Sequence, residues 1–337
     1  VEIVFSKVKW YISGTGFYLP PRVVSNEEMS KYMDTTDKWI QERTGIKERR
    51  YVDPGVGPSD LAIPATEQAL NAAGLTVKDI DFIIFATSTP DYYAPGSGCL
   101  LQNKMGFGEI GAVDVRVQCS GFLYGLSIAE QYIRTGMFKH ILLIGAEVQS
   151  TAMNLTTEGR DTAIIFGDGA GAAIISKTDE NRGIMSTHLH TDGRYVKELW
   201  LESPSSKSGH PRITGKDLHE GKQYLQMNGK EVFRHAVTRF PEVIWEALDA
   251  NNLKKDDIHL LIPHQANLRI TQTIQKKMGL ENNQVISNIH KYGNTTAGTI
   301  PIALGEAVEE GKVSKGNILV FASFGSGFSW ASAVVKW

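Results

Sequence analysis

Two segments, "CSGFLYGLSIAEQYIRTG" (119–136) and "NTTAGTIPIALGEAVEEG" (294–311), have the same pattern although they lie far apart in the chain. In each, a small polar residue opens a helix-like stretch, a glycine closes it, and a run rich in β-branched residues follows. Cys119 opens the first segment and Asn294 opens the second. This correspondence predicts a duplicated chain whose two halves present matching helix starts.

A second correspondence supports the duplication. A helix, a turn and the start of a strand recur in order, 178 residues apart: Ala69, Leu70, Ala72, Leu75, Asp79 and Ile80 return as Ala247, Leu248, Ala250, Leu253, Asp257 and Ile258. We therefore expect an N-terminal half over 1–178 and a C-terminal half over 179–337. The alternative is that the similarity reflects only the helix-strand units that every α/β chain repeats.

Short apolar runs alternate with segments of helical period along the whole chain. The runs are "DFIIFATS" (81–88), "HILLIGAE" (140–147), "TAIIFGDGAGAAIIS" (162–176), "HLLIPH" (259–264) and "NILVFASF" (317–324). The first residues, "VEIVFSKVKWYISGTG" (1–16), alternate like a further strand, and the polar stretch 201–224 reads as a surface excursion. This pattern predicts the α/β class with buried strands.

The composition excludes several kinds of partner. With 35 basic and 37 acidic residues the net charge is −2, so no overall charge draws the chain to nucleic acid or to an anionic membrane. No apolar run approaches the roughly 18 residues of a membrane span, and we expect a cytoplasmic protein. Two cysteines, without CxxC or HExxH, predict neither a disulfide framework nor a metal site.

Cys119 lies where the alternating run "AVDVRVQ" (112–118) gives way to the helical pattern. Unpaired N–H groups at a helix start favour a thiolate, so we expect a lowered thiol pKa and a nucleophile. A buried and inert cysteine is the alternative at this position. Cys99 lies inside an apolar helical stretch, where a buried structural role is expected.

Two residues of the second half can assist such a thiol. His264 follows a buried strand and precedes a helix, which is the carboxyl-end position where sites of α/β proteins collect. Asn294 is either an ordinary N-cap or a neutral N–H donor that faces the same point as Cys119. The glycine-rich stretch "SFGSGFSW" (323–330) either reverses a hairpin or offers backbone N–H groups to an oxyanion.

Together, Cys119 in "VQCSGFLYGLSIAEQYI", His264 in "PHQANLRI" and Asn294 in "YGNTTAGTIP" resemble the β-ketoacyl-acyl-carrier-protein synthase III family of thiolase-fold condensing enzymes. The stretches "DKWIQERTGIKER" (37–49) and "IIFGDGAGA" (164–172) are also similar to that family. The similarity runs from about residue 11 to the C-terminus. Elongating synthases would have a second histidine in place of Asn294, and degradative thiolases a second cysteine.

The resemblance implies a duplicated, five-layered αβαβα protomer with two mixed central sheets, working as a homodimer. The cysteine would come from the first half, and the histidine and asparagine from the second. The implied activity is that of an acyltransferase of fatty-acid biosynthesis. The resemblance implies no metal or redox cofactor, and it makes the coenzyme A thioester a substrate.

The implied mechanism has two half-reactions. The Cys119 thiolate would attack an acyl-CoA, with the oxyanion held by backbone N–H groups of Cys119 and, by similarity, of Ser326, where the family usually has glycine. Malonyl-acyl-carrier protein would then lose carbon dioxide. Its enolate, stabilised by N–H donation from His264 and Asn294, would attack the acyl-cysteine and give a β-ketoacyl product.

Substrate contacts follow from the same motifs. Trp39 and Arg43 resemble the residues that sandwich the adenine of coenzyme A, and Arg160 resembles another contributor to that site. Asn267 resembles the residue beside the pantetheine thioester, and Phe324 would wall the site next to the enolate. Surface packing of Trp39, a solvated Arg160 and a helix-start role for Asn267 are the alternatives.

Two further expectations concern the partners. Arg269, Lys276 and Lys277, on the helix after His264, could form the basic patch that an acidic carrier protein needs, or simply a solvated helix face. Ala94 falls where acetyl-preferring members often place a phenylalanine that crosses the dimer interface and caps the acyl tunnel. A small residue there would admit a longer or branched primer.

Two other functions remain open at this point. A synthase III-like enzyme of secondary metabolism would use the same acyl-cysteine with another acceptor, and would form alkylquinolones, polyketides or ketones. A catalytically silent partner subunit would keep the fold alone, although it would have no chemical need to keep all three of Cys119, His264 and Asn294.

Overall fold

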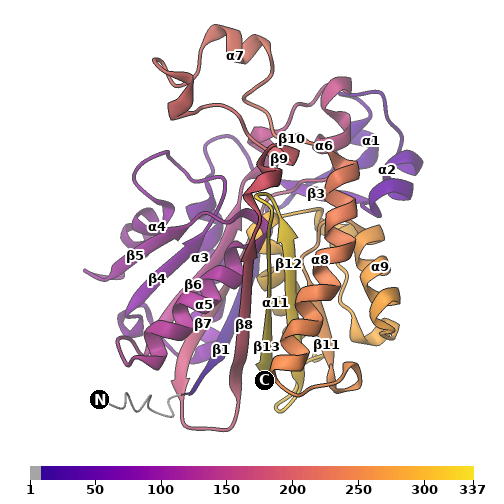
Figure 1. Ribbon diagram of the computed structural model, residues 1–337. Coiled ribbons are helices and arrows are strands. Elements are labelled where there is room, and N and C mark those ends of the chain that lie inside the picture. The colour runs from indigo at the N-terminus through magenta and orange to yellow at the C-terminus, as the bar shows by residue number, and fades with distance from the viewer. Residues whose placement is uncertain (1–8) are drawn as a thin grey trace.

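Two mixed β-sheets, each covered by helices on both faces, make up the computed structural model, which describes residues 9–337 (Figure 1). The expected strand at the N-terminus is described only from Lys9 onward, and residues 1–8 of that prediction lie outside the described part of the chain. The α/β class and the two mixed sheets agree with the sequence analysis.

The first sheet has the strand order β1-β7-β6-β4-β5. Its strands are β1 (Lys9–Tyr18), β4 (Phe82–Ala86), β5 (Gly111–Val115), β6 (His140–Glu147) and β7 (Gly169–Thr178). β4 is parallel to β5 and β6, whereas β7 is antiparallel to β6 and β1. The strand predicted over 162–176 is wrong in its first part, because β7 starts only at Gly169 and residues 164–166 instead reach the segment of Asn294.

The second sheet repeats this order as β8-β13-β12-β11. Its strands are β8 (Gly183–Thr191), β11 (Leu260–Pro263), β12 (Ile318–Gly325) and β13 (Ser329–Lys336). β11 is parallel to β12, and β13 is antiparallel to both β12 and β8. Val285 forms a single parallel bridge with Leu261 of β11, at the place that β5 takes beside β4 in the first sheet. The duplication is therefore visible in the topology, and the expected boundary at 178/179 falls between β7 and β8.

Helices complete five layers. α3 (Pro58–Ala73) and α4 (Ser97–Met105) cover the outer face of the first sheet, and α8 (Gly229–Ala250) and α9 (Leu268–Met278) cover that of the second. α5 (Gly121–Arg134) and α11 (Thr299–Glu309) lie between the sheets. One apolar core joins both sheets to these two helices. The middle layer thus places the starts of α5 and α11 between the two halves.

The repeated helix-turn-strand unit has the same local chemistry in both halves. In the turn after α3, Asp79 accepts a hydrogen bond from the Thr76 N–H at 2.8 Å, and after α8 Asp257 accepts one from the Lys254 N–H at 2.7 Å. Each turn leads into a strand through an isoleucine that is almost fully buried.

Short elements close one end of the molecule around the site. They are β2 (Arg22–Ser25), α1 (Asn26–Met29), α2 (Asp37–Thr44), β3 (Glu48–Tyr51), α6 (Arg160–Ala163), β9 (Leu199–Trp200), β10 (Gln226–Met227) and α10 (Ile289–Tyr292). The predicted excursion 201–224 leaves between β9 and β10 and carries α7 (Gly215–His219), which projects from the body at the top of Figure 1.

Candidate active site

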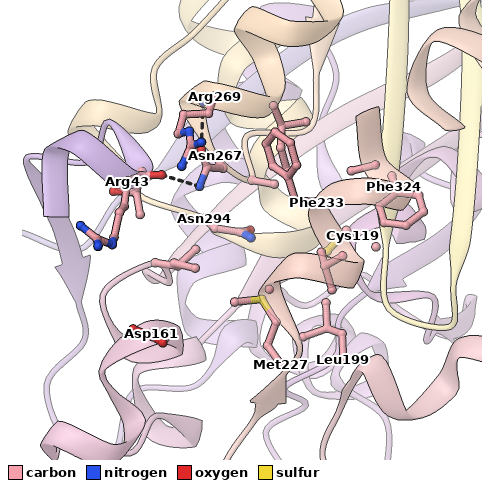
Figure 2. A pocket seen from close by; sticks show the side chains of 18 of the residues that line it. Arg43, Cys119, Asp161, Leu199, Met227, Phe233, Asn267, Arg269, Asn294 and Phe324 are labelled. Carbon is pink, nitrogen blue, oxygen red and sulfur yellow. Dashed lines mark hydrogen bonds between the residues drawn. The ribbon is translucent and has the colours of Figure 1, made fainter. Parts of the chain in front are cut away.

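A cavity of about 480 Å³ brings Cys119, His264 and Asn294 to one place, and we call it the first cavity (Figure 2). Cys119 lies just before α5, His264 follows β11, and Asn294 precedes α11. Five other predicted site residues also line this cavity: Trp39, Arg43, Asn267, Arg269 and Phe324. Residues from both halves therefore meet at the middle layer.

Both helix starts have the same backbone form. A short 3₁₀ turn leads into the helix, η2 (Gln118–Ser120) before α5 and η9 (Thr296–Gly298) before α11. The first residue of each turn has a positive φ, Gln118 with φ 44° and Thr296 with φ 49°. The predicted correspondence of Cys119 with Asn294 is therefore wrong by three residues, because Cys119 matches Ala297 in this register and Asn294 lies two residues before its turn.

The Cys119 thiol is 5% exposed, and its surroundings correct the expected pKa. Burial raises the pKa of Cys119 to about 12, and the nearby Glu147 carboxyl adds to the increase. The backbone N–H groups of Ser326 and of Cys119 itself lower the pKa, but they are outweighed. The prediction of a lowered pKa was wrong for this state, so the thiol needs a proton acceptor to become a nucleophile.

His264 supplies such an acceptor. Its Nδ1 lies 2.6 Å from the Thr299 hydroxyl oxygen, and that hydroxyl donates its only hydrogen to the Thr296 carbonyl. The oxygen must therefore accept from Nδ1–H, which leaves the lone pair on Nε2. Nε2 is buried without a partner among residues 9–337, and burial lowers the pKa of His264 to about 3. The ring is neutral and presents a base to the cavity.

Asn294 has its amide orientation fixed by the backbone. Its Oδ1 accepts a hydrogen bond from the Thr296 N–H at 2.8 Å, which is the N-cap role that the sequence left open. The Nδ2 group is then free to donate, and Figure 2 shows the amide directed toward Cys119. The N-cap and the N–H donor are therefore compatible roles of one side chain.

The turn between β12 and β13 closes over the sulfur. The Ser326 N–H is directed at Cys119, as expected for one donor of an oxyanion hole. The Ser326 hydroxyl is occupied elsewhere, because it donates to the Leu199 carbonyl. At Gly325 a Cβ atom would lie 2.6 Å from Cys119 Sγ, so only glycine fits there. The serine in place of the usual glycine is thus accommodated without loss of the backbone donor.

The residues expected to bind adenine are close together. The Arg43 guanidinium carbon lies 4.0 Å from the centre of the Trp39 ring, and that of Arg160 lies 4.6 Å from it. Arg160 also donates to the Asp34 carbonyl at 2.6 Å and does not itself line the first cavity. An adenine that stacks on Trp39 would have to displace one of the two guanidinium groups.

Asn267 and Phe324 lie at opposite sides of the first cavity (Figure 2). Asn267 caps α9 by accepting from the Arg269 N–H, and it donates to the Arg43 carbonyl at 3.0 Å, so its amide is committed to the protein. Phe324 is almost fully buried and packs against the Phe328 ring at 4.8 Å. Its position is that of a wall beside the nucleophile.

The predicted basic patch is exposed on α9. Arg269 lies at the cavity, 5.7 Å from the centre of the Phe233 ring, and Lys277 donates to the Val237 carbonyl of α8 at 2.7 Å. Lys276 completes the set on the same helix. Of the three, only Arg269 lines the first cavity, and the two lysines lie in the last turn of the same helix.

Ala94 does not reach the site within one chain. It is exposed in the loop between β4 and α4, where the neighbouring Tyr93 ring lies 4.4 Å from the Arg212 guanidinium of the excursion. Its role at an acyl tunnel remains a prediction that requires a second copy. The buried role expected for Cys99 was wrong, because this thiol is exposed on α4.

A second cavity of about 250 Å³ also has Cys119 in its wall. Behind the wall lies Glu147, the last residue of β6, fully buried and surrounded by donors from Ser88, Thr89 and Gln149. Burial raises the pKa of Glu147 to about 7. The sequence analysis missed this group, although an acidic residue at the end of an apolar strand could have indicated it.

Two features are absent from the part of the chain that the structure describes. No helix between residues 9 and 337 is both long and apolar enough to cross a membrane. Within the same range, no three or more histidine, cysteine, aspartate or glutamate side chains come together as a metal site.

Comparison with known proteins agrees with the geometry. Residues 113–193 match the family model for 3-oxoacyl-[acyl-carrier-protein] synthase III, and residues 248–337 match the model for its C-terminal part. The β-ketoacyl-[acyl-carrier-protein] synthase III of Caldanaerobacter subterraneus is 43% identical over 333 residues, 98% of each chain.

Solved structures superpose over nearly the whole chain. The 3-oxoacyl-[acyl-carrier-protein] synthase III of Aquifex aeolicus is 36% identical, with a TM-score of 0.89 over 98% of this chain and 100% of that one. The priming β-ketosynthase of the R1128 polyketide pathway is 30% identical, with a TM-score of 0.89 over 97% and 96%. The chain therefore belongs to the β-ketoacyl-acyl-carrier-protein synthase III family of acyl-transferring, thiolase-fold condensing enzymes.

Proposed function

We propose that the chain catalyses the condensation that initiates fatty-acid biosynthesis, joining an acyl-CoA primer to malonyl-acyl-carrier protein. One observation carries this proposal: a buried thiol, a neutral imidazole with a free Nε2 and an amide with a free Nδ2 line a single cavity. The membership of the family defines the reaction class to which these groups belong.

In the first half-reaction, His264 Nε2 takes the thiol proton as Cys119 Sγ attacks the thioester carbonyl. The oxyanion accepts hydrogen bonds from the N–H groups of Cys119 and Ser326. The carbon-sulfur bond to coenzyme A breaks, and the leaving thiolate takes the proton back from Nε2. A base is required here because the pKa of the buried thiol is far above neutral.

In the second half-reaction, malonyl-acyl-carrier protein loses carbon dioxide, and the electrons of the broken bond form an enolate. Asn294 Nδ2–H donates to its oxygen, and the Thr296 contact holds that donor in place. His264 joins as a donor only in the tautomer that carries its proton on Nε2. The enolate carbon then attacks the acyl-cysteine, and the Cys119 sulfur leaves.

The partners belong to the same proposal. Coenzyme A would enter past Trp39 and Arg43, and the acidic carrier protein would meet the exposed cations of α9. A homodimer in the cytoplasm is expected, and β5 supports pairing between copies. It is an edge strand of the first sheet, and its Val113 is exposed.

A second candidate function differs only in the acceptor. The likeness to a priming β-ketosynthase of a polyketide pathway favours this alternative. The acyl-Cys119 intermediate would be the same, but malonyl thioesters other than that of the fatty-acid carrier protein would be consumed. Turnover with malonyl-acyl-carrier protein and with malonyl-CoA, over a panel of primers, separates the two functions.

Intact-protein mass spectrometry after incubation with acyl-CoA tests the proposal directly. We expect one acyl adduct on the wild type and on Cys99→Ala, and none on Cys119→Ala. The exposed Cys99 is the matched control, because it is the only other cysteine of the chain. An adduct that persists in Cys119→Ala would overturn the acyl-enzyme mechanism.

A further inference from the structure

The second cavity is the space in which a primer carried on Cys119 must lie. Cys119 lines both cavities, whereas Trp39, Arg43 and Asn267 line the first one only. The second substrate needs the first cavity for its own pantetheine arm, so the acyl group has to occupy the second. This step rests on the proposed function.

Most of the second cavity has an apolar wall or polar side chains that already have hydrogen-bond partners in the protein. Its apolar wall consists of Ala152, Phe166, Val196, Leu199, Trp200, Leu201 and Leu225. On the polar wall, the hydroxyls of Ser88 and Thr89 donate to Glu147 at 2.9 and 2.7 Å, and Gln149 Nε2 donates to the Thr296 hydroxyl at 2.9 Å. These donors face Glu147 and one another, and they shield the cavity from its carboxylate.

Arg116 is different. It is an exposed residue that also lines this cavity, and its guanidinium has no hydrogen bond, ion pair or ring contact with any residue of the described range 9–337. Gln118 also lines the cavity, and its side-chain amide has no partner there. Only two residues separate Arg116 from Cys119, so their Cα atoms, three positions apart, lie within about 11 Å of each other. A short acyl chain on Sγ is therefore within reach of this cation.

An unpaired guanidinium in the wall of a mainly apolar cavity selects for a carboxylate, which it can bind through two parallel hydrogen bonds. We infer that the second cavity accepts primers whose far end carries a carboxylate, that is, CoA monothioesters of short dicarboxylic acids, with Arg116 as the specificity-determining residue and Gln118 as a second donor. The acyl transfer itself is unchanged: the bond to Cys119 Sγ forms, the bond to the coenzyme A sulfur breaks, and the distal carboxylate takes no part.

The experiment measures the rate of acyl-Cys119 formation by quenched intact-protein mass spectrometry on the full chain. Primers are compared in pairs of equal carbon number: succinyl- with butyryl-CoA, glutaryl- with pentanoyl-CoA, and adipyl- with hexanoyl-CoA. We expect at least one dicarboxylic primer to react about tenfold faster than its partner, and Arg116→Gln to remove that advantage while the neutral primers change less than about threefold. Arg182→Gln, just before β8 and outside the lining of both cavities, is the control and should change neither class.

Several results would overturn the inference. Neutral primers that react as fast as or faster than all three dicarboxylic primers would do so, and so would an equal loss of both classes in Arg116→Gln. In both cases the neutral adduct on Cys119 would leave the proposed function intact. If no primer of either class acylated Cys119, the proposed function and the inference would fail together.

Discussion

The Cys119 and Asn294 junctions have the same backbone design and opposite chemical tasks. Both use a residue of positive φ, a 3₁₀ turn and a helix of the middle layer. The first presents a thiol whose ionisation is opposed by burial and by Glu147, and the second presents an amide that a backbone contact orients. The duplication thus provided two similar turns, but the two side chains are not at equivalent positions: Cys119 lies inside the first turn, whereas Asn294 lies two residues before the second.

The variant expected to separate the two half-reactions most clearly is Asn294→Asp. Aspartate keeps the acceptor for the Thr296 N–H but replaces the N–H donor with a charge that repels the enolate. We expect condensation to fall by about 10²- to 10³-fold, because a donor to the developing negative charge is lost. Acyl transfer to Cys119 should remain within a few-fold of wild type.

Release of labelled carbon dioxide from malonyl-acyl-carrier protein measures one step, and the Cys119 adduct measures the other. Equal losses in both would show that Asn294 does not act selectively in the second half-reaction. The same pair of assays on His264→Ala should show losses in both steps, because the imidazole serves each of them.

The next test concerns the backbone conformation at Gly293, directly before Asn294. At Gly293, φ 66° and ψ −157° form a combination that side chains avoid, and a Cβ atom would lie 2.7 Å from the Ile165 carbonyl oxygen. Gly293→Ala should lower the free energy of unfolding by on the order of 3 kcal/mol. Chemical denaturation measures this loss. A variant as stable as wild type would mean that the junction can rearrange.

A smaller effect is expected from Glu147→Gln. The native pKa of Glu147 is raised from 4.5 to about 7, so the folded state holds a proton that the unfolded state releases between these values. The resulting stabilisation is present below about pH 4.5 and is lost as the pH rises through 7. Glutamine cannot ionise, so the stability of wild type relative to the variant should fall by on the order of 3 kcal/mol between pH 4.5 and 8.

Denaturant titrations at both pH values measure this difference. Because the Glu147 charge also raises the pKa of Cys119, iodoacetamide should alkylate the variant faster than wild type at pH 8. An unchanged pH profile would mean that folding does not raise the pKa of Glu147. Unchanged alkylation in addition would remove this residue from the account of the thiol.

The smallest effect is expected at Gln118, the counterpart of Thr296 in the first turn. A non-glycine residue at φ 44° is mildly strained, so Gln118→Gly should relieve that strain and stabilise the fold by about 0.5–1 kcal/mol. Thermal unfolding measures the gain. A loss of stability would instead indicate that the Gln118 side chain makes favourable contacts which outweigh the strain.

Much of the fold was predictable because local patterns specify it. Periodicity marked the helices and strands, and the recurrence of Asp79 as Asp257 followed from a turn that needs the same carboxylate twice. The strand predicted over 162–176 was wrong at its beginning, because the β-branched residues Ile164 and Ile165 are buried outside the sheet. Arg49 is fully buried and donates to the Ile164 carbonyl, which directs this segment toward Asn294.

The sequence singled out several residues that the fold brings to one cavity, but it did not show the electrostatics of that cavity. A helix start is a local signal, and it correctly singled out Cys119 as a residue of the cavity. The direction of its pKa depends on burial and on Glu147, which comes from another strand, and no local pattern reports either. For the same reason, no pattern in the sequence could show that the exposed Arg116 lies beside the second cavity without a protein partner.

The single core between the sheets has a consequence for unfolding. Phe122 of α5 and Ile300 of α11 belong to one apolar cluster with Leu143 of the first sheet and Phe321 of the second. Neither half can therefore open without exposing apolar surface of the other. Although the chain has the length of two domains, we expect heat to melt it in one cooperative transition, with activity and secondary structure lost at the same temperature.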